Sequence, residues 1–255
     1  MKRLSAPTRF FNGLGQRVAY FYVRRLMLSD VEWTTRIPPG AKIIAANHPT
    51  TSDPFFLMSW PFEPMYILIA ESAFKVPLVG LFLRLAGHIP VYPDRGREAF
   101  ETALRLLSEG HTVGIFPEGA LSEDDGQLVT ARTGAVRLAV TARVPIIPAG
   151  IALDRHFVTR RQLRQSEVTE KMRWFWLGAY EVSGGAPLVF EHGPDDREAV
   201  LRSTNTLTGE IERLVKRSAK RLLDASWPLN DDVPASAPER EPRPPSAVRA
   251  TGNGS

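Results

Sequence analysis

A polar loop directly after an apolar stretch holds the residues best suited to proton transfer. It reads NHPTTSD over residues 47–53 and places Asp53 five positions after His48. A carboxylate that accepts a hydrogen bond from one imidazole nitrogen fixes the histidine tautomer and stabilises the imidazolium that forms when the ring takes a proton. We therefore expect His48 to act as a general base and Asp53 to orient it.

The same aspartate also fits a structural role. Asp53 precedes Pro54, and this pair is typical of a helix start, because an Asp side chain caps free N–H groups and Pro suits the first helical position. We expect one carboxylate oxygen to cap the helix and the other to accept from His48. The spacing alone does not distinguish a catalytic role of Asp53 from helix capping, so evidence from the surrounding segments is needed.

The elements that position this loop follow from the apolar pattern. Buried strands are predicted at 42–46, 65–70, 88–91, 112–116 and 145–151, with further strands at 173–182 and 187–190. Helical spacing is present before Gly110, at 135–142 and, in amphipathic form, at 195–223. Alternating strands and helices predict an α/β fold, and 255 residues suffice for one well-buried domain.

Three more motifs follow the loop in a fixed order. They are GHIPV at 87–91, followed by DRGR at 94–97, then FPEG at 116–119 and VPIIP at 144–148. With NHxxxxD they resemble the glycerolipid acyltransferase family that includes 1-acylglycerol-3-phosphate acyltransferases, over roughly residues 40–190. The resemblance implies a single-domain α/β fold with a mixed, largely parallel central sheet flanked by helices.

The resemblance also implies a reaction. His48 deprotonates a free hydroxyl of a lysophospholipid, and this hydroxyl attacks the thioester of acyl-CoA or acyl carrier protein without a covalent acyl-enzyme. The expected acceptor is 1-acylglycerol-3-phosphate, which gives phosphatidic acid in phospholipid biosynthesis. No cofactor is expected, because the acyl thioester is a substrate. The acceptor is expected to contact Glu118 and Gly119. Its phosphate is expected to contact Arg95, and Lys75 and Arg97 are the next candidates for this contact.

Two departures from the family pattern concern the acceptor. Two residues are inserted ahead of Arg95, and the usual EGTRS reads EGALS, so the phosphate-binding arginine of that motif is missing. Arg132 or Arg137 would supply replacement charge, although a solvated helix face is the favoured interpretation of both. A different lipid or a glycolipid acceptor therefore stays open.

The composition of the chain excludes several kinds of site and binding partner. Cysteine is absent, which excludes disulfides, a thiolate nucleophile and cysteine metal sites, and fits a reducing cytosolic setting. The five histidines show no metal-binding spacing, so no metal is expected. A net charge of +4 and a pI near 9.6 suit anionic lipid or phosphorylated substrate. Nucleic acid is not an expected partner, because the basic residues are dispersed.

The ends of the chain differ from its centre. Residues 1–30 predict an amphipathic helix in which aromatic residues alternate with arginines, suited either to the lipid headgroup region or to covering the core. Residues 31–226 form the expected acyltransferase domain, and 227–255 a disordered Pro-rich tail. No stretch of about eighteen apolar residues occurs. We expect peripheral or monotopic attachment at the cytoplasmic face of the cell membrane.

Two rival functions would also use residues of this loop or this fold. A serine hydrolase would use Ser52 or Ser122 with His48, but no GxSxG nucleophile elbow is present. A noncatalytic membrane-binding member of the fold would not need the His48 and Asp53 pair. Both rivals are less consistent with the four motifs than acyl transfer.

Overall fold

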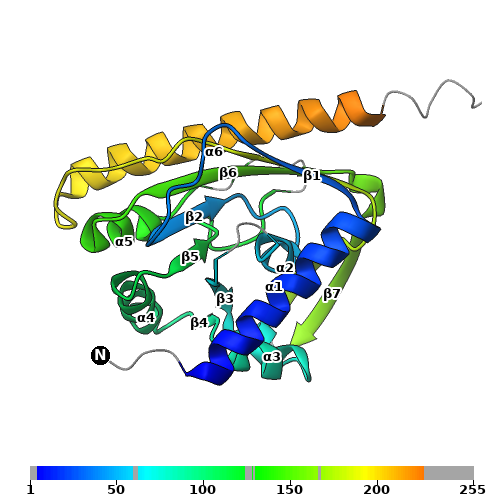
Figure 1. Ribbon diagram of the computed structural model, residues 1–255, viewed down its shortest axis with the longest axis horizontal. Helices are drawn as coiled ribbons and strands as arrows, with labels where there is room; N and C mark the ends of the chain where they lie inside the picture. The colour runs from blue at the N-terminus through cyan, green and yellow to red at the C-terminus, as the bar shows by residue number, and fades with distance from the viewer. Residues whose placement is uncertain (1–4, 60–62, 124–127, 129, 166–167, 227–255) are drawn as a thin grey trace, which may run out of the picture.

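The computed structural model describes residues 5–59, 63–123, 128, 130–165 and 168–226. In this part of the chain a mixed sheet of seven strands forms the centre, in the order β1-β9-β6-β2-β5-β3-β4 (Figure 1). Its strands are β1 (Leu28–Trp33), β2 (Lys42–Ala46), β3 (Met65–Ala70), β4 (Ile89–Val91), β5 (Thr112–Ile115), β6 (Ile146–Leu153) and β9 (Ala179–Gly184). Two further strands, β7 (Thr159–Gln165) and β8 (Val168–Trp174), pair as a separate antiparallel ribbon.

Helices cover both faces of this sheet. They are α1 (Ala6–Leu26), α2 (Asp53–Leu57), α3 (Val79–Leu85), α4 (Gly96–Ser108), α5 (Gly134–Ala142) and α6 (Arg197–Ser226), with short 3₁₀ turns η1 (Glu71–Lys75) and η2 (Arg155–Phe157). The fold is therefore the single α/β domain with a mixed, largely parallel sheet that the resemblance implied.

Strand direction brings the motifs to one edge of the sheet. Strands β6, β2, β5, β3 and β4 run parallel, whereas β9 is antiparallel to β6 and β1 runs with β9. The carboxyl ends of the five parallel strands consequently meet at the same edge, where sites form in open α/β sheets. Strand β2 pairs with both β5 and β6, so the loop that carries His48 leaves the middle of this edge.

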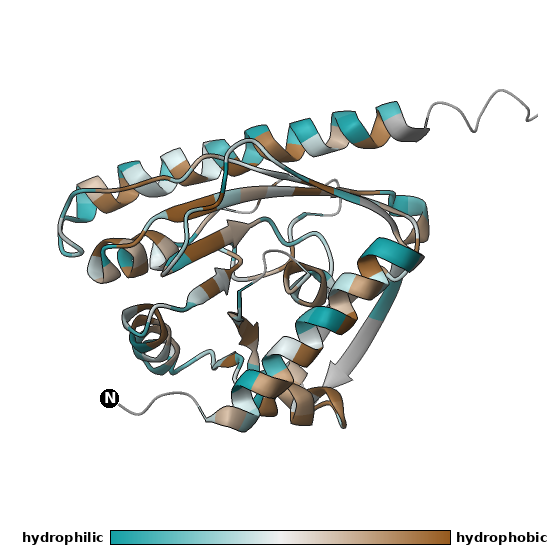
Figure 2. Cartoon of the chain, in the orientation of Figure 1, coloured by the Kyte–Doolittle hydropathy of each residue, from teal (hydrophilic) through white to brown (hydrophobic). Residues whose placement is uncertain are grey.

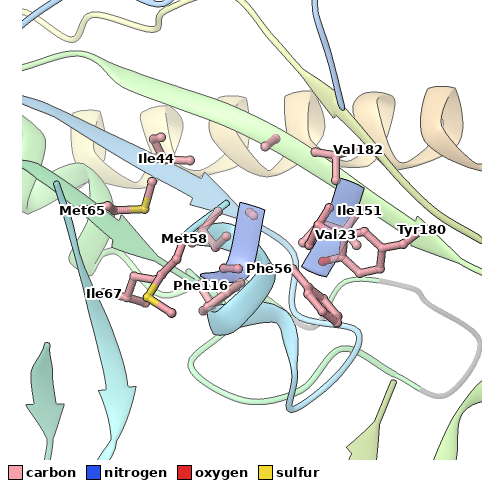
Figure 3. Close-up of a cluster of buried hydrophobic side chains, with 14 of the residues drawn as sticks. Val23, Ile44, Phe56, Met58, Met65, Ile67, Phe116, Ile151, Tyr180 and Val182 are labelled. Atoms are coloured by element: carbon pink, nitrogen blue, oxygen red, sulfur yellow. The ribbon is translucent and has the colours of Figure 1, made fainter. Parts of the chain in front are cut away.

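The central strand β2 is buried on both faces, which explains its continuous apolar sequence. Successive side chains of a strand point to opposite faces. Ile43 and Ala45 join the apolar cluster formed with α4, α5 and α6. Ile44 and Ala46 join a second cluster with α1, α2 and α3, whose centre is shown in Figure 3. Packing on both faces fixes where β2 ends and the loop begins.

Helix α6 holds the sheet at β6 through close backbone contact (Figure 1). A Cβ atom at Gly150 would lie 2.1 Å from the backbone nitrogen of Val215, so only glycine allows this approach. The Ser218 hydroxyl donates to the Gly150 carbonyl at 2.8 Å. The long amphipathic helix expected at 195–223 is confirmed as α6, which spans Arg197–Ser226.

Several predicted boundaries were wrong. The segment 173–182 is not one strand, because β8 ends at Trp174, Gly178 has a φ of +114° and β9 starts only at Ala179. The segment 187–190 forms an isolated bridge to Ile146 rather than a strand. Strands β1 and β7 were not predicted, since LSDVEW and TRRQLRQ show no apolar run.

The N-terminal helix α1 forms as expected and packs on the core through Ala19 and Val23. Asn12 ties it to the sheet, since its side-chain amide donates to the carbonyls of Met65 and Ala86 at 2.9 and 3.1 Å. None of the helices in the described ranges combines the length and the apolar character needed to cross a bilayer. Residues 227–255, where a disordered tail was predicted, lie outside the described residues.

Candidate functional site

The loop after β2 brings His48 and Asp53 into direct contact. The Nδ1 atom of His48 lies 2.9 Å from Oδ2 of Asp53, and a carboxylate can only accept, so Nδ1 carries the proton. The aspartate is fully buried, whereas the His48 side chain is 17% exposed. No described residue bonds to Nε2 of His48. Nε2 therefore carries a lone pair that can accept a proton from a substrate.

Four donors hold the Asp53 carboxylate. Besides His48, the backbone N–H of Thr50 donates to Oδ2 at 2.7 Å, and the Thr50 hydroxyl donates to Oδ1 at 2.6 Å. The Tyr180 hydroxyl donates to Oδ1 at 3.2 Å. Helix α2 starts at Asp53 with Ser52 as its N-cap, and no side chain caps it. The expected capping role of Asp53 was wrong, because Thr50 and Tyr180 turn both oxygens back toward the loop.

Tyr180 comes from β9, on the far side of β6, and its hydroxyl is reliably protonated. Burial, and secondarily the charge of Asp53, hold the pKa of Tyr180 well above its usual value. The ring packs on Phe56 with centroids 4.7 Å apart, as Figure 3 illustrates. The protonated hydroxyl therefore serves as a hydrogen-bond donor to the aspartate. No sequence signal near His48 pointed to this residue.

The FPEG turn supports His48 from the neighbouring strand β5. The imidazole stacks on Phe116 with ring centroids 4.1 Å apart. Glu118 is buried, and its Oε1 accepts from the backbone N–H of His48 at 2.8 Å and from the Ser122 hydroxyl at 2.7 Å. The Ser122 N–H in turn donates to the His48 carbonyl at 2.8 Å. Glu118 thus lies beside His48 and holds its backbone, and its contact with the acceptor stays a prediction.

The end of β8 and the residue that follows it contact both loops. The Thr51 N–H donates to the Arg173 carbonyl at 2.7 Å, and the Arg173 N–H donates to the Thr51 hydroxyl at 3.1 Å. The Arg173 guanidinium also donates to the Ser122 carbonyl. The Phe175 N–H donates to Ser52 Oγ at 3.1 Å. These contacts join the NHPTTSD loop to the loop that follows FPEG.

Neither serine forms a nucleophile with the imidazole. Ser52 is buried and its Oγ accepts from a backbone N–H. The hydroxyl of Ser122 contacts Glu118 and the backbone nitrogen of His48, not its ring. The geometry therefore offers no Ser–His pair for a hydrolase.

Gly119 closes the turn in a conformation that favours glycine. Its φ is +66°, and an added Cβ would lie 2.9 Å from Nε of Arg132. The Arg132 N–H donates to the Pro117 carbonyl at 2.8 Å, which places the exposed arginine side chain over the turn. Arg137 lies elsewhere, in a hollow between α5 and the start of α6.

Within the described ranges, the three expected phosphate ligands form no hydrogen bond or ion pair with the His48 loop, and each pairs with a carboxylate of its own segment. Lys75 pairs with Glu71 at 2.9 Å and Arg97 with Glu101 at 2.8 Å. Arg95 lies over the Tyr92 ring, 4.3 Å from its centroid, with Glu98 at 3.7 Å. Across the described ranges, no cluster of three or more His, Asp or Glu side chains is arranged to hold a metal ion.

Comparison with known proteins agrees with these motifs. The acyltransferase family matches residues 29–152. A 1-acyl-sn-glycerol-3-phosphate acyltransferase of Bacillus subtilis is 33% identical over 90 residues, covering 35% of this chain and 43% of that protein. Human 1-acyl-sn-glycerol-3-phosphate acyltransferase beta is 33% identical over 134 residues, covering 51% of this chain and 47% of that protein.

A solved structure shares the architecture. The 1-acyl-sn-glycerophosphate (LPA) acyltransferase of Thermotoga maritima superposes with a TM-score of 0.57 at 19% identity, over 82% of this chain and 78% of that one. At this identity the similarity shows the fold. The matched segments span less than half the length of the two curated relatives, at 43% and 47%.

Proposed function

Because residues 29–152 match the acyltransferase family, we propose that this protein transfers an acyl group from a thioester to a free hydroxyl of a lysophospholipid. The single observation that carries the proposal is the His48–Asp53 pair, at 2.9 Å, with Nε2 of His48 left available at the carboxyl edge of the sheet. A group of this kind is suited to take a proton from a hydroxyl.

The chemistry follows from that geometry. Nε2 of His48 accepts the proton of the acceptor hydroxyl as its oxygen forms a bond to the thioester carbonyl carbon. Asp53, held by Thr50 and Tyr180, stabilises the imidazolium that results. Collapse of the tetrahedral intermediate breaks the carbon–sulfur bond, and the imidazolium returns its proton to the departing thiolate. The products are the ester and a free thiol, with His48 neutral again.

Support for the acceptor class comes from the relatives, whose names specify 1-acyl-sn-glycerol-3-phosphate. We propose the same acceptor here, with phosphatidic acid as product and acyl-CoA or acyl carrier protein as donor. A lipid acceptor has to be reached from a membrane, and one surface of the protein is suited to that contact.

This surface, the α1–α3 apolar surface, consists of exposed side chains of two neighbouring helices and the turn before α3. Its members are Phe10, Leu14, Val18, Phe21, Leu78, Leu81 and Leu85. The helices touch where Gly15 faces Phe82, and Figure 2 shows the hydrophobic colour of α3 beside the first turns of α1. Leu78 is 82% exposed. Contiguous exposed apolar side chains of this kind suit a membrane.

Charge on α1 fits the same partner. The helix carries four exposed arginines and no acidic residue. Guanidinium groups bind lipid phosphates while rings enter the acyl boundary, and anionic lipids of the cytoplasmic leaflet attract such segments. We propose peripheral attachment at that face. The Tyr22 ring of α1 contacts Phe55 and Phe56 of α2, the helix that starts at Asp53, so the surface adjoins the site.

The test is an acceptor and donor panel with purified protein. Radiolabelled acyl-CoA and acyl carrier protein are each offered with 1-acylglycerol-3-phosphate, neutral monoacylglycerol, lysophospholipids and glycolipids, in vesicles. We expect labelled phosphatidic acid as the main product. Absence of transfer to every acceptor, or hydrolysis of the thioester without transfer, would refute the proposal.

A further inference from the structure

The three phosphate ligands expected from the sequence are already engaged in ion pairs. Lys75, Arg95 and Arg97 each have a carboxylate partner on their own segment. Among the described residues, none of the three forms a hydrogen bond or ion pair with the loops around His48. A ligand at any of these three cations would compete with an existing ion pair. A cation that adjoins the turn beside His48 and has no carboxylate partner is better suited to this role.

Arg132 is such a cation. Its guanidinium lies over Gly119, with Nε 2.9 Å and Cζ 3.0 Å from the position a Cβ would take there. Its backbone is fixed by the hydrogen bond to the Pro117 carbonyl, at 2.8 Å. Among the residues that the structure describes, no carboxylate pairs with it. The side chain is exposed, so a ligand has access to it.

The turn under Arg132 is the one that supports His48. Phe116 stacks on the imidazole and Glu118 accepts from the His48 N–H, while Gly119 follows directly. One short turn therefore contacts both the Arg132 guanidinium and His48. The two positions after Gly119 are Ala120 and Leu121, which bring no charge to this turn. Arg132, thirteen residues beyond Gly119, supplies it from another segment.

From these contacts we infer that Arg132 binds the phosphate of the acceptor, and that Gly119 lacks a side chain to make room for its guanidinium. A guanidinium binds phosphate oxygens through two parallel hydrogen bonds. In 1-acylglycerol-3-phosphate the phosphate lies only a few bonds from the reacting hydroxyl, so it must be held close to His48. The phosphates of CoA lie at the far end of the pantetheine arm. The inference rests on the proposed function and specifies its acceptor.

The first experiment measures acceptor discrimination. The ratio of kcat/KM for 1-acylglycerol-3-phosphate to that for neutral monoacylglycerol is determined with acyl-CoA for wild type, Arg132→Ala and Arg132→Lys. We expect the ratio to fall about ten- to hundredfold in the alanine variant, through a higher KM for the phosphate acceptor, with partial recovery in the lysine variant. Arg137→Ala, an exposed arginine in a separate hollow, is the matched control and should keep the wild-type ratio.

The second experiment does not depend on turnover. Titration of glycerol 3-phosphate into wild type and Arg132→Ala, followed by NMR, should show a Kd at least about tenfold weaker in the variant. An unchanged acceptor ratio and Kd would overturn the assignment, as would an equal loss on both acceptors, which indicates the CoA phosphates. If the wild type transfers no acyl group at all, the proposed function fails, and the titration still decides the role of Arg132.

Discussion

At the scale of single residues, the Asp53 carboxylate is held in place before any substrate binds. Thr50 supplies two of its donors from the same loop, and Tyr180 supplies another from β9. The carboxylate is fully buried, so each lost donor leaves an oxygen without a water to replace it. The orientation of His48 therefore depends on residues that lie far from it in the sequence.

Replacement of Tyr180 by Phe tests this dependence. The change removes one hydroxyl and leaves the ring, so kcat should fall about three- to tenfold with little change in KM, because the imidazolium is less well stabilised. Tyr66→Phe is a matched control, since Tyr66 is also buried and its hydroxyl has no hydrogen-bond partner among the described residues. Steady-state kinetics over a pH range distinguishes the two. Equal losses in both variants would show that only packing was disturbed.

The pairing of His48 with Asp53 could be predicted because both residues lie in one short loop. Tyr180 could not, because its contact depends on which strands become neighbours. The sequence offered Arg132 only as one of two candidate replacement charges, because the way a turn is filled depends on the fold. The cap expected from Asp53–Pro54 was wrong for a related reason. Local propensity favours capping, but in the folded protein the hydroxyls of Thr50 and Tyr180 donate to the Asp53 carboxylate instead.

At the scale of elements, the buried parallel strands were the most predictable part of the fold. The bounds of β2 and β3 match the apolar runs, because strands covered on both faces need continuous apolar sequence. Strand β1 reads LSDVEW and owes its place to its parallel partner β9. Pairing of this kind is decided by tertiary contact and leaves little signal in the strand itself.

His88, directly before β4, links elements and predicts a dependence of stability on pH. Its Nδ1 accepts from the Ile67 N–H of β3 at 3.2 Å, and burial lowers the pKa of His88 to about 4. In the unfolded chain the ordinary pKa is about 6.5, so the unfolded state binds more protons between these values. Stability from this group is complete above pH 6.5 and is lost as the pH falls toward 4.

Urea unfolding of wild type and His88→Gln across this range measures the effect. The wild type should lose about 3 kcal/mol more than the variant between pH 7 and pH 4, because glutamine can accept from Ile67 but does not titrate. His156→Gln is the control, since that side chain is 95% exposed. Parallel curves for wild type and His88→Gln would contradict a buried neutral His88.

At the scale of the whole molecule, α1 has one face that packs on the core and one that is exposed. One face packs on the core through Ala19 and Val23, while Phe10 and Phe21 are 64% and 62% exposed on the other. The sequence pattern of this helix suits either core packing or membrane contact. The structure shows the first and leaves an apolar face for the second. The α1–α3 apolar surface is therefore the part of the molecule where a lipid bilayer is expected.

Leu78 tests that surface without touching the core. Leu78→Ser should weaken binding to anionic vesicles severalfold in cosedimentation, because the side chain is the most exposed apolar group on the surface. Leu223→Ser on α6 is the matched control, with a side chain that is 69% exposed away from this surface. Equal vesicle binding by the two variants would exclude the α1–α3 apolar surface as the attachment site.

The most direct test of the central claim is the rate of acyl transfer by His48→Ala. With labelled acyl-CoA and 1-acylglycerol-3-phosphate, this account predicts a loss of kcat of about a hundred- to ten-thousandfold. Circular dichroism and vesicle binding should stay close to wild type, because the imidazole is partly exposed and only its contacts with Asp53 and Phe116 are lost. A folded His48→Ala protein that transfers acyl groups at a rate near that of wild type would contradict the assignment of His48 as general base.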